Sequence, residues 1–406
     1  MTGLLWPGDH RAGDAFSDAS VVAAAVRVES VWLSALGEIG VAPRFADGIV
    51  DEAGAALADD AEIAALAAAG ENAGNPIVPL LSRLRDLLAD RDPDAARWLH
   101  AGLTSQDVLD TALMIVTRDT VRAIRAELDG VITALAGHLD RHRSTPMIGR
   151  TLTQPAVEIT AGVKIAAWCD GVLDADDDLT ALRFPASLSG AAGSRSGTVA
   201  LGVAAPRDLA DTVAAGLGLA TTHPWHTTRA PITRAADALQ GCTAALGRIA
   251  TDVITGSRPE IGEFTEPTAA GRGGSSAMPQ KVNPVLSVLI RRTALTAPAL
   301  AALIHTAAAD AGDERPPGAW HVEWEPLQSM ARHTLAAARQ AAELTAGLQI
   351  HADAMAGRVA RHRDDIDAEH RTLGRLVGRD DIDARGDADA IVDATLTRIR
   401  HREDHP

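Results

Sequence analysis

The segment from residue 271 to residue 284 places two hydroxyls, a cation and an amide within one short loop. It reads Gly-Arg-Gly-Gly-Ser-Ser-Ala-Met-Pro-Gln-Lys-Val-Asn-Pro, so Ser275 and Ser276 lie six and five residues before Lys281, and Asn283 follows. Its glycines allow positive φ angles and a close approach of the backbone to a ligand. A serine hydroxyl is a poor base unless a neighbouring cation stabilises its alkoxide. The segment therefore predicts proton transfer next to a bound carboxylate.

This stretch resembles the signature of the fumarase/aspartase superfamily, Gly-Ser-Ser-x-Met-Pro-x-Lys-x-Asn-Pro, and every fixed position is present. The resemblance implies that Ser275 transfers the proton, that Lys281 supports it and that Ser276 orients it. It also implies that Met278 and Asn283 contact the substrate. The reaction implied is a reversible β-elimination through an aci-carboxylate, without a cofactor or a metal. The fold implied is all-α, with three domains around a central bundle of long helices, in a homotetramer whose active sites are shared between subunits.

A second block, His-Ala-Gly-Leu-Thr-Ser-Gln-Asp-Val-Leu-Asp-Thr-Ala, begins at His100 and leads into a long helical pattern. Thr104 and Ser105 stand where that helix begins, and the free N–H groups of a helix N-terminus attract anions. The alternative is that either hydroxyl only caps the helix. The block resembles the first signature region of the adenylosuccinate lyase branch, in which a histidine matches His100. Because the chain carries two signatures, we predict that these three residues bind the substrate carboxylates.

A third block, residues 149–156, reads Gly-Arg-Thr-Leu-Thr-Gln-Pro-Ala. It resembles the pattern Arg-Thr-His-x-Gln-x-Ala of fumarases and adenylosuccinate lyases, in which the histidine works with a glutamate five residues past the signature asparagine. Here these two positions hold Leu152 and Val288, and leucine cannot carry a proton. The joint loss is self-consistent, because losing one member alone would leave an unpaired polar group. Arg150 and Gln154 keep the pattern and are predicted to bind substrate.

The apolar residue in this block resembles the branch of 3-carboxy-cis,cis-muconate cycloisomerases. Pro-Trp-His-x-x-Arg at 224–229 and Glu-Arg at 314–315 resemble that branch too, which implies that His226 and Arg315 contact the substrate. The predicted reaction interconverts 3-carboxymuconate, a small tricarboxylate, and its lactone, because a leaving carboxylate needs no general acid. An adenylosuccinate-type or other succinyl lyase that releases fumarate is the first alternative. A structural member without activity is the second.

Composition and charge narrow the class of protein. The 406-residue chain is rich in alanine, with 3 % aromatic residues and no tyrosine, which favours close-packed helices over sheets. A net charge of −16 disfavours nonspecific binding to nucleic acids or membranes. We find no apolar run of about 18 residues and no disulfide pattern in the two cysteines, and therefore expect a cytoplasmic protein. His223 and His226 lack a third metal ligand nearby, and the acidic run 174–178 is predicted to be a solvated helix end.

Helical spacing of apolar residues, interrupted by proline and glycine, predicts the elements that must position these blocks. The run without proline from residue 105 to residue 142 is typical of a bundle of long helices. We expect domains at 1–98, 99–350 and 351–406, with the bundle in the second. The predicted helices are 18–40, 53–69, 80–89, 105–142, 155–182, 228–256, 284–311 and 323–348.

Overall fold

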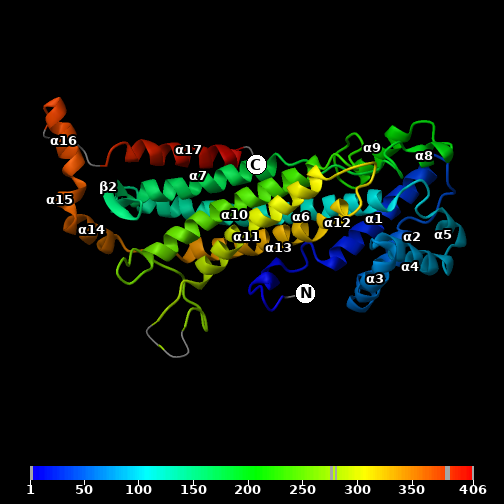
Figure 1. Ribbon diagram of the computed structural model, residues 1–406, viewed down its shortest axis with the longest axis horizontal. Helices are drawn as coiled ribbons and strands as arrows, with labels where there is room; N and C mark the ends of the chain where they lie inside the picture. Colours follow the sequence, from blue (N-terminus) through cyan, green and yellow to red (C-terminus); the bar gives the residue numbers. More distant parts are fainter. Residues whose placement is uncertain (1–2, 275–277, 279–280, 380–384, 405–406) are drawn as a thin grey trace. The chain divides into compact units, whose positions relative to one another are not determined.

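The computed structural model describes residues 3–274, 278, 281–379 and 385–404, and these are mainly helical (Figure 1). The predicted all-α fold is therefore confirmed. The chain forms two compact units. Unit 1 comprises Met1–Ala123, Ala181–Leu239 and Ala297–Leu335, and unit 2 comprises Ile124–Thr180, Gln240–Thr296 and Ala336–Pro406. The expected domain limits near residues 98 and 350 stay a prediction.

Long helices cross from one unit to the other, and shorter elements belong to one unit each. The long helices are α6 (Ser105–Arg141), α10 (Ala230–Gly256), α11 (Val285–Ala309) and α13 (Trp324–Gly347), within two residues of their predicted bounds. Unit 1 also holds η1 (Asp9–Ala12), α1 (Asp18–Glu38), α2 (Ile49–Gly54), η2 (Ala55–Ala58), α3 (Asp60–Ala73), α4 (Ile77–Ala89), α5 (Pro93–Trp98), α8 (Ser196–Ala200), α9 (Pro206–Gly216) and α12 (Ala319–Val322). Unit 2 also holds β1 (Pro146–Thr151), β2 (Gln154–Thr160), α7 (Ala161–Thr180), β3 (Phe264–Thr265), β4 (Gln349–Ile350), α14 (Ala352–Arg361), α15 (Arg363–Ile366), α16 (Ala368–Val377) and α17 (Ala388–Asp404).

Helix α1 positions the second sequence block. Its N-cap is Ser17, whose hydroxyl accepts a hydrogen bond from the backbone N–H of Ser20 at 3.1 Å. The helix packs against α2, α3 and α9 and buries Trp32. The indole of Trp32 donates to the carbonyl of Ala101 at 2.8 Å, which holds the loop ahead of α6 in place.

Helix α6 buries one stripe along its length, as the 3.6-residue period requires. Thr111 on this helix also tethers a loop far away in the sequence, because its hydroxyl donates to the carbonyl of Ser187 and accepts from the N–H of the same residue. The buried stripe consists of Leu109, Leu113, Val116, Ile124, Leu128, Val131, Leu135 and Leu139.

The helix predicted over 155–182 is wrong in its first six residues, which belong to a strand. Strands β1 and β2 pair antiparallel across a two-residue turn formed by Leu152 and Thr153. The helix α7 therefore begins only at Ala161. Its second residue, Gly162, packs against the backbone of Arg143, where an added Cβ would lie 2.7 Å from the carbonyl oxygen. The hairpin, which carries Arg150 and Gln154, was not predicted.

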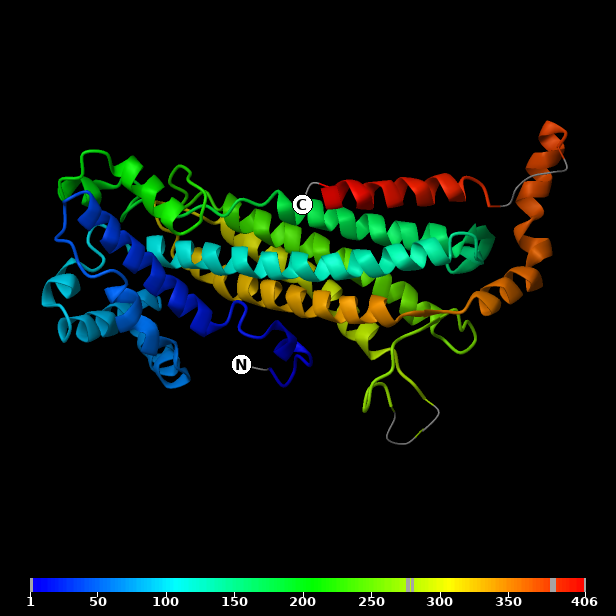
Figure 2. The same ribbon diagram turned by 180° about the vertical axis from the view of Figure 1, so that it is seen from behind.

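The acidic run at the end of α7 is only partly solvated, because Asp174, Asp177 and Asp178 are exposed whereas Asp176 is buried. In both views α17 lies along α7 (Figure 1, Figure 2), and the acidic residues bind its arginines. Arg398 contacts Asp174 and Asp177, each at 2.7 Å. Asp176 is buried between Arg402 of α17, at 2.8 Å, and Arg125, at 2.9 Å. The run therefore clamps the C-terminal helix α17 to α7 within unit 2.

Two helices are apolar on average over a long stretch, although charged residues interrupt both. By length and composition alone, α1 and α11 could cross a membrane, and the matching windows are 56 % and 33 % buried. Helix α11 leaves Val288, Leu295 and Leu303 exposed. Buried core helices of soluble proteins pass the same test, so the expectation of a protein without membrane contact stays a prediction.

Candidate active site

Arg315 carries a positive charge that no carboxylate neutralises within the part of the chain that the structure describes. Its Nε donates to Oε1 of Gln106 at 3.2 Å. Its Nη2 donates to the hydroxyl of Thr104 and to the carbonyl of Ala191. The guanidinium carbon lies 6.0 Å from the centroid of the Trp320 ring. Because all three acceptors are neutral, the charge of this guanidinium remains available to bind an anionic group such as a carboxylate.

The first turn of α6 is capped by a carboxylate and not by a hydroxyl. The N–H of Thr104 donates to Oδ2 of Asp107 at 3.1 Å, which is the return half of a capping box. The hydroxyl of Thr104 accepts from Arg315 instead, and Ser105 follows as the first helical residue. The simple capping alternative therefore does not account for Thr104.

Asp107 is fully buried and accepts four hydrogen bonds. Its Oδ1 accepts from Ser189 N at 2.7 Å and from His226 Nε2 at 3.0 Å, while its Oδ2 accepts from Gly190 N at 2.8 Å and from Thr104 N. His226 is thereby fixed in the interior, and its Nδ1 has no partner within the described residues. The sequence reasoning missed Asp107, although the aspartate spacing of the second block contained the signal.

Arg229 forms a buried charge cluster with two carboxylates. Its Nη1 lies 2.7 Å from Asp110 and its Nη2 lies 2.6 Å from Glu323. Burial lowers the pKa of Arg229, but the two carboxylates outweigh it and raise that pKa overall. Burial raises the pKa of Glu323, and Arg229 offsets part of the rise. Trp320 donates to Asp110 at 2.9 Å, so the cluster fixes the segment that follows Arg315.

His100 lies in the loop ahead of α6 with a left-handed backbone, at φ +66°. Its Nδ1 is 2.6 Å from Oε1 of Glu29, a fully buried residue of α1. The ring is mostly buried, with a side chain that is 16 % exposed. The predicted site residues of unit 1 therefore lie on the loop ahead of α6, on its first turn, or on segments hydrogen-bonded to that loop and turn. They are His100, Thr104, Ser105, His226 and Arg315.

In unit 2 the charge of Arg150 is already compensated. Its two terminal nitrogens bind Glu263 at 2.7 Å and 3.0 Å, and Glu263 is buried. Arg358 of α14 lies 3.9 Å from the same carboxylate. The pair anchors β1, whereas Gln154 at the start of β2 is exposed and its side-chain amide donates to the hydroxyl of Thr153. The sequence alone could not show whether Arg150 stabilises the fold or binds the substrate.

The signature loop is closed at its base by Asn283. Both its backbone N–H and its side-chain amide donate to the carbonyl of Gly273, at 2.8 Å and 3.0 Å. Gly273 has φ +73°, and an added Cβ would lie 2.7 Å from the carbonyl of Asn283. Lys281 and Met278 are exposed. The predicted catalytic Ser275 and Ser276 lie outside the described residues.

Helix α11 follows the loop, and free N–H groups of its first turn bind a side chain of the same protein. Glu266 accepts from the backbone N–H groups of Leu286 at 3.0 Å and Ser287 at 2.7 Å. A hollow of about 160 Å³ lies beside these residues and is bordered by Asn283 and Arg272. Arg272 is paired with Glu343 at 2.6 Å.

Comparison with known proteins decides the family. Residues 14–298 match a protein family described as lyase. A nitrosuccinate lyase of Streptomyces davaonensis is 43 % identical over 365 residues, which cover 87 % of this chain and 76 % of the relative. The chain belongs to the fumarase/aspartase superfamily of lyases. Its members also include the 3-carboxy-cis,cis-muconate cycloisomerase of Acinetobacter baylyi, 33 % identical over 343 residues that cover 84 % of this chain and 75 % of that one. The crystal structure of the 3-carboxy-cis,cis-muconate lactonizing enzyme of Pseudomonas putida superposes with a TM-score of 0.83 at 28 % identity, covering 96 % of this chain and 97 % of that one.

This fumarase/aspartase lyase lacks the histidine and glutamate pair in both described positions. Leu152 is 96 % exposed at the turn between β1 and β2 and has φ +48°, followed by Thr153 at φ +72°. Val288 is 50 % exposed in the first turn of α11. Both side chains are apolar and reach solvent in the single chain, so neither position can donate a proton.

The lyase uses lysine at only two positions. Among its 38 lysine and arginine residues, Lys164 and Lys281 are the lysines and the other 36 are arginines. Lys164 is paired with Asp252 at 3.4 Å. Lys281 forms no ion pair with any described residue. A compact ammonium that can lose a proton differs from a planar, permanently charged guanidinium. A chain that uses arginine almost everywhere therefore keeps an amine in the signature loop.

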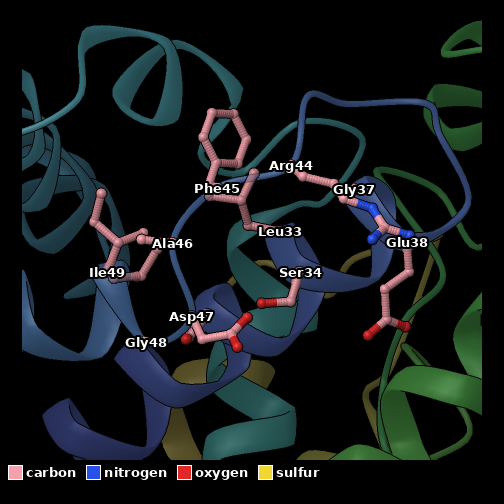
Figure 3. Close-up of a pocket in the computed structure, with 12 residues that line it drawn as sticks. Leu33, Ser34, Gly37, Glu38, Arg44, Phe45, Ala46, Asp47, Gly48 and Ile49 are labelled. Carbon is pink, nitrogen blue, oxygen red and sulfur yellow. The ribbon is translucent and has the colours of Figure 1, made fainter.

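One hollow of unit 1 contains none of the predicted site residues. It has a volume of about 360 Å³ and lies between the second half of α1 and residues 44–50 (Figure 3). Glu38, Arg44 and Asp47 border it, as Figure 3 shows. Within the described residues, no group of three or more histidine, cysteine, aspartate or glutamate side chains is placed to hold a metal ion. The prediction of a metal-free enzyme stays a prediction.

Proposed function

We propose that this lyase catalyses β-elimination of nitrite from nitrosuccinate, which gives fumarate. A base removes the proton on the carbon next to one carboxylate, and the electron pair forms an aci-carboxylate. The pair then forms the carbon–carbon double bond, while the carbon–nitrogen bond breaks and its electrons leave with nitrite. The proton stays on the base until water removes it. No oxidant or reductant is needed.

The observation that carries this proposal is the apolar pair Leu152 and Val288. Amine and hydroxide leaving groups are helped greatly by a general acid, whereas nitrite, a weak base, departs as a stable anion. A lyase without a proton donor at both positions is therefore suited to such a leaving group. The 43 % identity to a nitrosuccinate lyase points to the same chemistry.

The charges available in the chain fit an anionic substrate. We assign proton transfer to Ser275, supported by Lys281 and oriented by Ser276. Arg315, whose described partners are all neutral, binds a substrate carboxylate together with Thr104. Preorganised cations of this kind stabilise the developing dianion more than the substrate, which is how they lower the barrier.

A second candidate is the cycloisomerase reaction on 3-carboxymuconate, which the sequence favoured first. It shares the property of a leaving group that needs no acid, since the group is the substrate's own carboxylate. Cycloisomerases from Acinetobacter baylyi and Pseudomonas putida are 33 % and 32 % identical to this chain, and these identities favour it. An adenylosuccinate-type reaction is less suited, because its amine leaving group calls for the missing acid. A member without activity is disfavoured by the intact signature loop.

We also propose that the active enzyme is a homotetramer with shared sites. Support comes from α11, whose side chains Val288, Leu295 and Leu303 remain exposed on a largely apolar helix. Apolar helix faces of this length are buried when a second helix packs on them. Light scattering at micromolar concentration should give four times the chain mass, and a monomer would contradict shared active sites.

The test of function is a side-by-side assay on purified protein. Nitrosuccinate, 3-carboxymuconate and adenylosuccinate are supplied separately, with fumarate, nitrite and lactone measured as products. We expect nitrosuccinate to give equal amounts of fumarate and nitrite, with a kcat/KM at least ten times that for lactonisation. The Ser275→Ala variant is the control and should be inactive but folded. Faster lactone formation than nitrite release would move the assignment to the cycloisomerase.

A further inference from the structure

Glu29 is a buried carboxylate with a single hydrogen-bond partner among the described residues. It lies on the inner face of α1 and is 0 % exposed. Its Oε1 is 2.6 Å from Nδ1 of His100, while its Oε2 is buried and has no hydrogen-bond partner within the described residues. A buried carboxylate normally has its oxygens satisfied, and an unsatisfied one is costly. Glu29 is thus a poor choice for stability alone.

The partner residue is also locally unfavourable. His100 has φ +66°, in the left-handed region that residues with side chains seldom occupy. Such backbone strain persists only where the surroundings impose it, and it clusters at functional sites. Two contacts fix the backbone around His100. Trp32 donates a hydrogen bond to the carbonyl of Ala101. Gly102, at φ +83°, is packed so closely that a Cβ added there would lie 3.0 Å from Leu201. The unpaired oxygen of Glu29 and the left-handed backbone of His100 therefore occur in the same pair of interacting residues.

The contact lies beside the proposed anion site. The N–H of Leu103 donates a hydrogen bond to the carbonyl of His100. The next residue is Thr104, whose hydroxyl accepts a hydrogen bond from Arg315. His100 is therefore held in the same short loop as the substrate-binding hydroxyl. Its Nε2 forms no hydrogen bond with any described residue.

We propose that Glu29 is a positioning residue for the elimination, acting through His100. A carboxylate can only accept hydrogen bonds, so the contact places a proton on Nδ1 and fixes the orientation of the ring. The other nitrogen, Nε2, is then the atom left to contact the substrate. Carboxylate partners fix the tautomer of catalytic histidines in the same way. The inference rests on the proposed function for its kinetic part only.

The first experiment needs no substrate. Nitrogen-15 NMR of the histidine rings in the full-length protein distinguishes a protonated from an unprotonated Nδ1, with His100→Gln used to assign the signal. We expect wild-type His100 to carry its proton on Nδ1, and Glu29→Gln to give a mixture of tautomers. An unchanged His100 signal in Glu29→Gln would overturn the proposal, whatever the substrate turns out to be.

The second experiment is a double-mutant cycle on nitrite release from nitrosuccinate. Glu29→Gln should lower kcat/KM by 10- to 100-fold, and His100→Ala by at least as much. The double variant should be no worse than His100→Ala, because Glu29 acts through the ring. Losses that multiply, or a Glu29→Gln enzyme within twofold of wild type, would show that Glu29 has no such role.

Controls separate positioning from folding. Glu38→Gln removes an exposed glutamate from the same helix and should leave kcat/KM unchanged. Glu29→Gln should unfold close to the wild-type temperature, because the amide has the same shape and leaves one buried polar atom unpaired, as the carboxylate does. If Glu29→Gln does not fold, Glu29→Asp keeps the charge at a shorter reach and should show the same tautomer mixture with a smaller kinetic loss. A wild-type protein inactive on nitrosuccinate would refute the proposed function but leave the NMR result to decide the role of Glu29.

Discussion

Arg150 and Glu263 form a two-point ion pair, with Nη2 to Oε1 at 2.7 Å and Nη1 to Oε2 at 3.0 Å. The pair joins strand β1 to the segment ahead of β3 within unit 2. Arg315, in unit 1, has neutral partners only among the residues that the structure describes. The sequence predicted both arginines to bind substrate. The structure shows that a carboxylate neutralises the charge of Arg150, whereas the described partners of Arg315 leave its charge unpaired.

Arg150→Ala should therefore act first on stability. It leaves the buried carboxylate of Glu263 with only the more distant Arg358, and breaking a buried pair costs about 3–5 kcal/mol. Urea denaturation should show that loss. The paired change Arg150→Met with Glu263→Met should recover most of it. If Arg150→Ala keeps wild-type stability and only KM rises, the residue binds substrate as the sequence suggested.

Arg315→Ala should act on catalysis and not on stability. Removing a charge-assisted hydrogen bond to the substrate costs about 1.5–3 kcal/mol, or roughly 10- to 150-fold in kcat/KM. Thermal unfolding should stay within a degree or so of wild type, because Arg315 is exposed. Arg234→Ala, an exposed arginine of the same unit, is the matched control. A loss under threefold would remove Arg315 from the site.

Lys281 should not tolerate arginine. Lys281→Ala should cost at least two orders of magnitude in kcat/KM, about 3 kcal/mol, because a charge facing the developing dianion is lost. Lys281→Arg should lose nearly as much, since a planar guanidinium does not replace a compact ammonium. Lys164→Arg, at the other lysine, should keep full activity. Equal activity of both arginine variants with wild type would mean that only charge matters at residue 281.

Leu152→His restores the residue of the elimination branches without its partner at Val288. If the leaving group needs no acid, the substitution should not accelerate nitrite release or lactonisation. It should slow them if the assembled enzyme buries the turn, since an imidazole would then lack a partner. Steady-state assays on nitrosuccinate and adenylosuccinate decide the matter. Fumarate release from adenylosuccinate by this variant would favour the amine lyase instead.

The clamp on α17 should open in acid. Burial raises the pKa of Asp176, but hydrogen bonds from Arg402 and Arg125 outweigh it and the pKa is lowered overall. The stabilisation is therefore complete above the unfolded value of about 3.9 and is lost as pH falls through the lower folded value. Asp176→Ala should cost about 3 kcal/mol at neutral pH, because two arginines lose their partner. Mass spectrometry of protease fragments should detect early release of α17, while Asp178→Ala, an exposed neighbour, should behave as wild type.

The long helices could be predicted because their apolar period is a local property of the sequence. The N-cap Ser17 and the start of α6 at Ser105 follow from the same local signals. The β1–β2 hairpin could not, since its pairing depends on contacts between segments and its turn uses Leu152 and Thr153 instead of the usual asparagine and glycine. The partners of charged residues are equally nonlocal. Nothing in the sequence separates Arg150, which is paired, from Arg315, which is not.

The scarcity of lysine gives this protein a chemical handle. Reagents that acylate amines find two side-chain targets in the chain, and one of them, Lys164, is engaged by Asp252. Lys281 is exposed and sits in the loop that bears the predicted proton-transfer serine. Among the side chains, a fluorophore or affinity tag is therefore expected to attach mainly at residue 281. Protection of that amine by a bound dicarboxylate then reports occupancy of the site without any turnover.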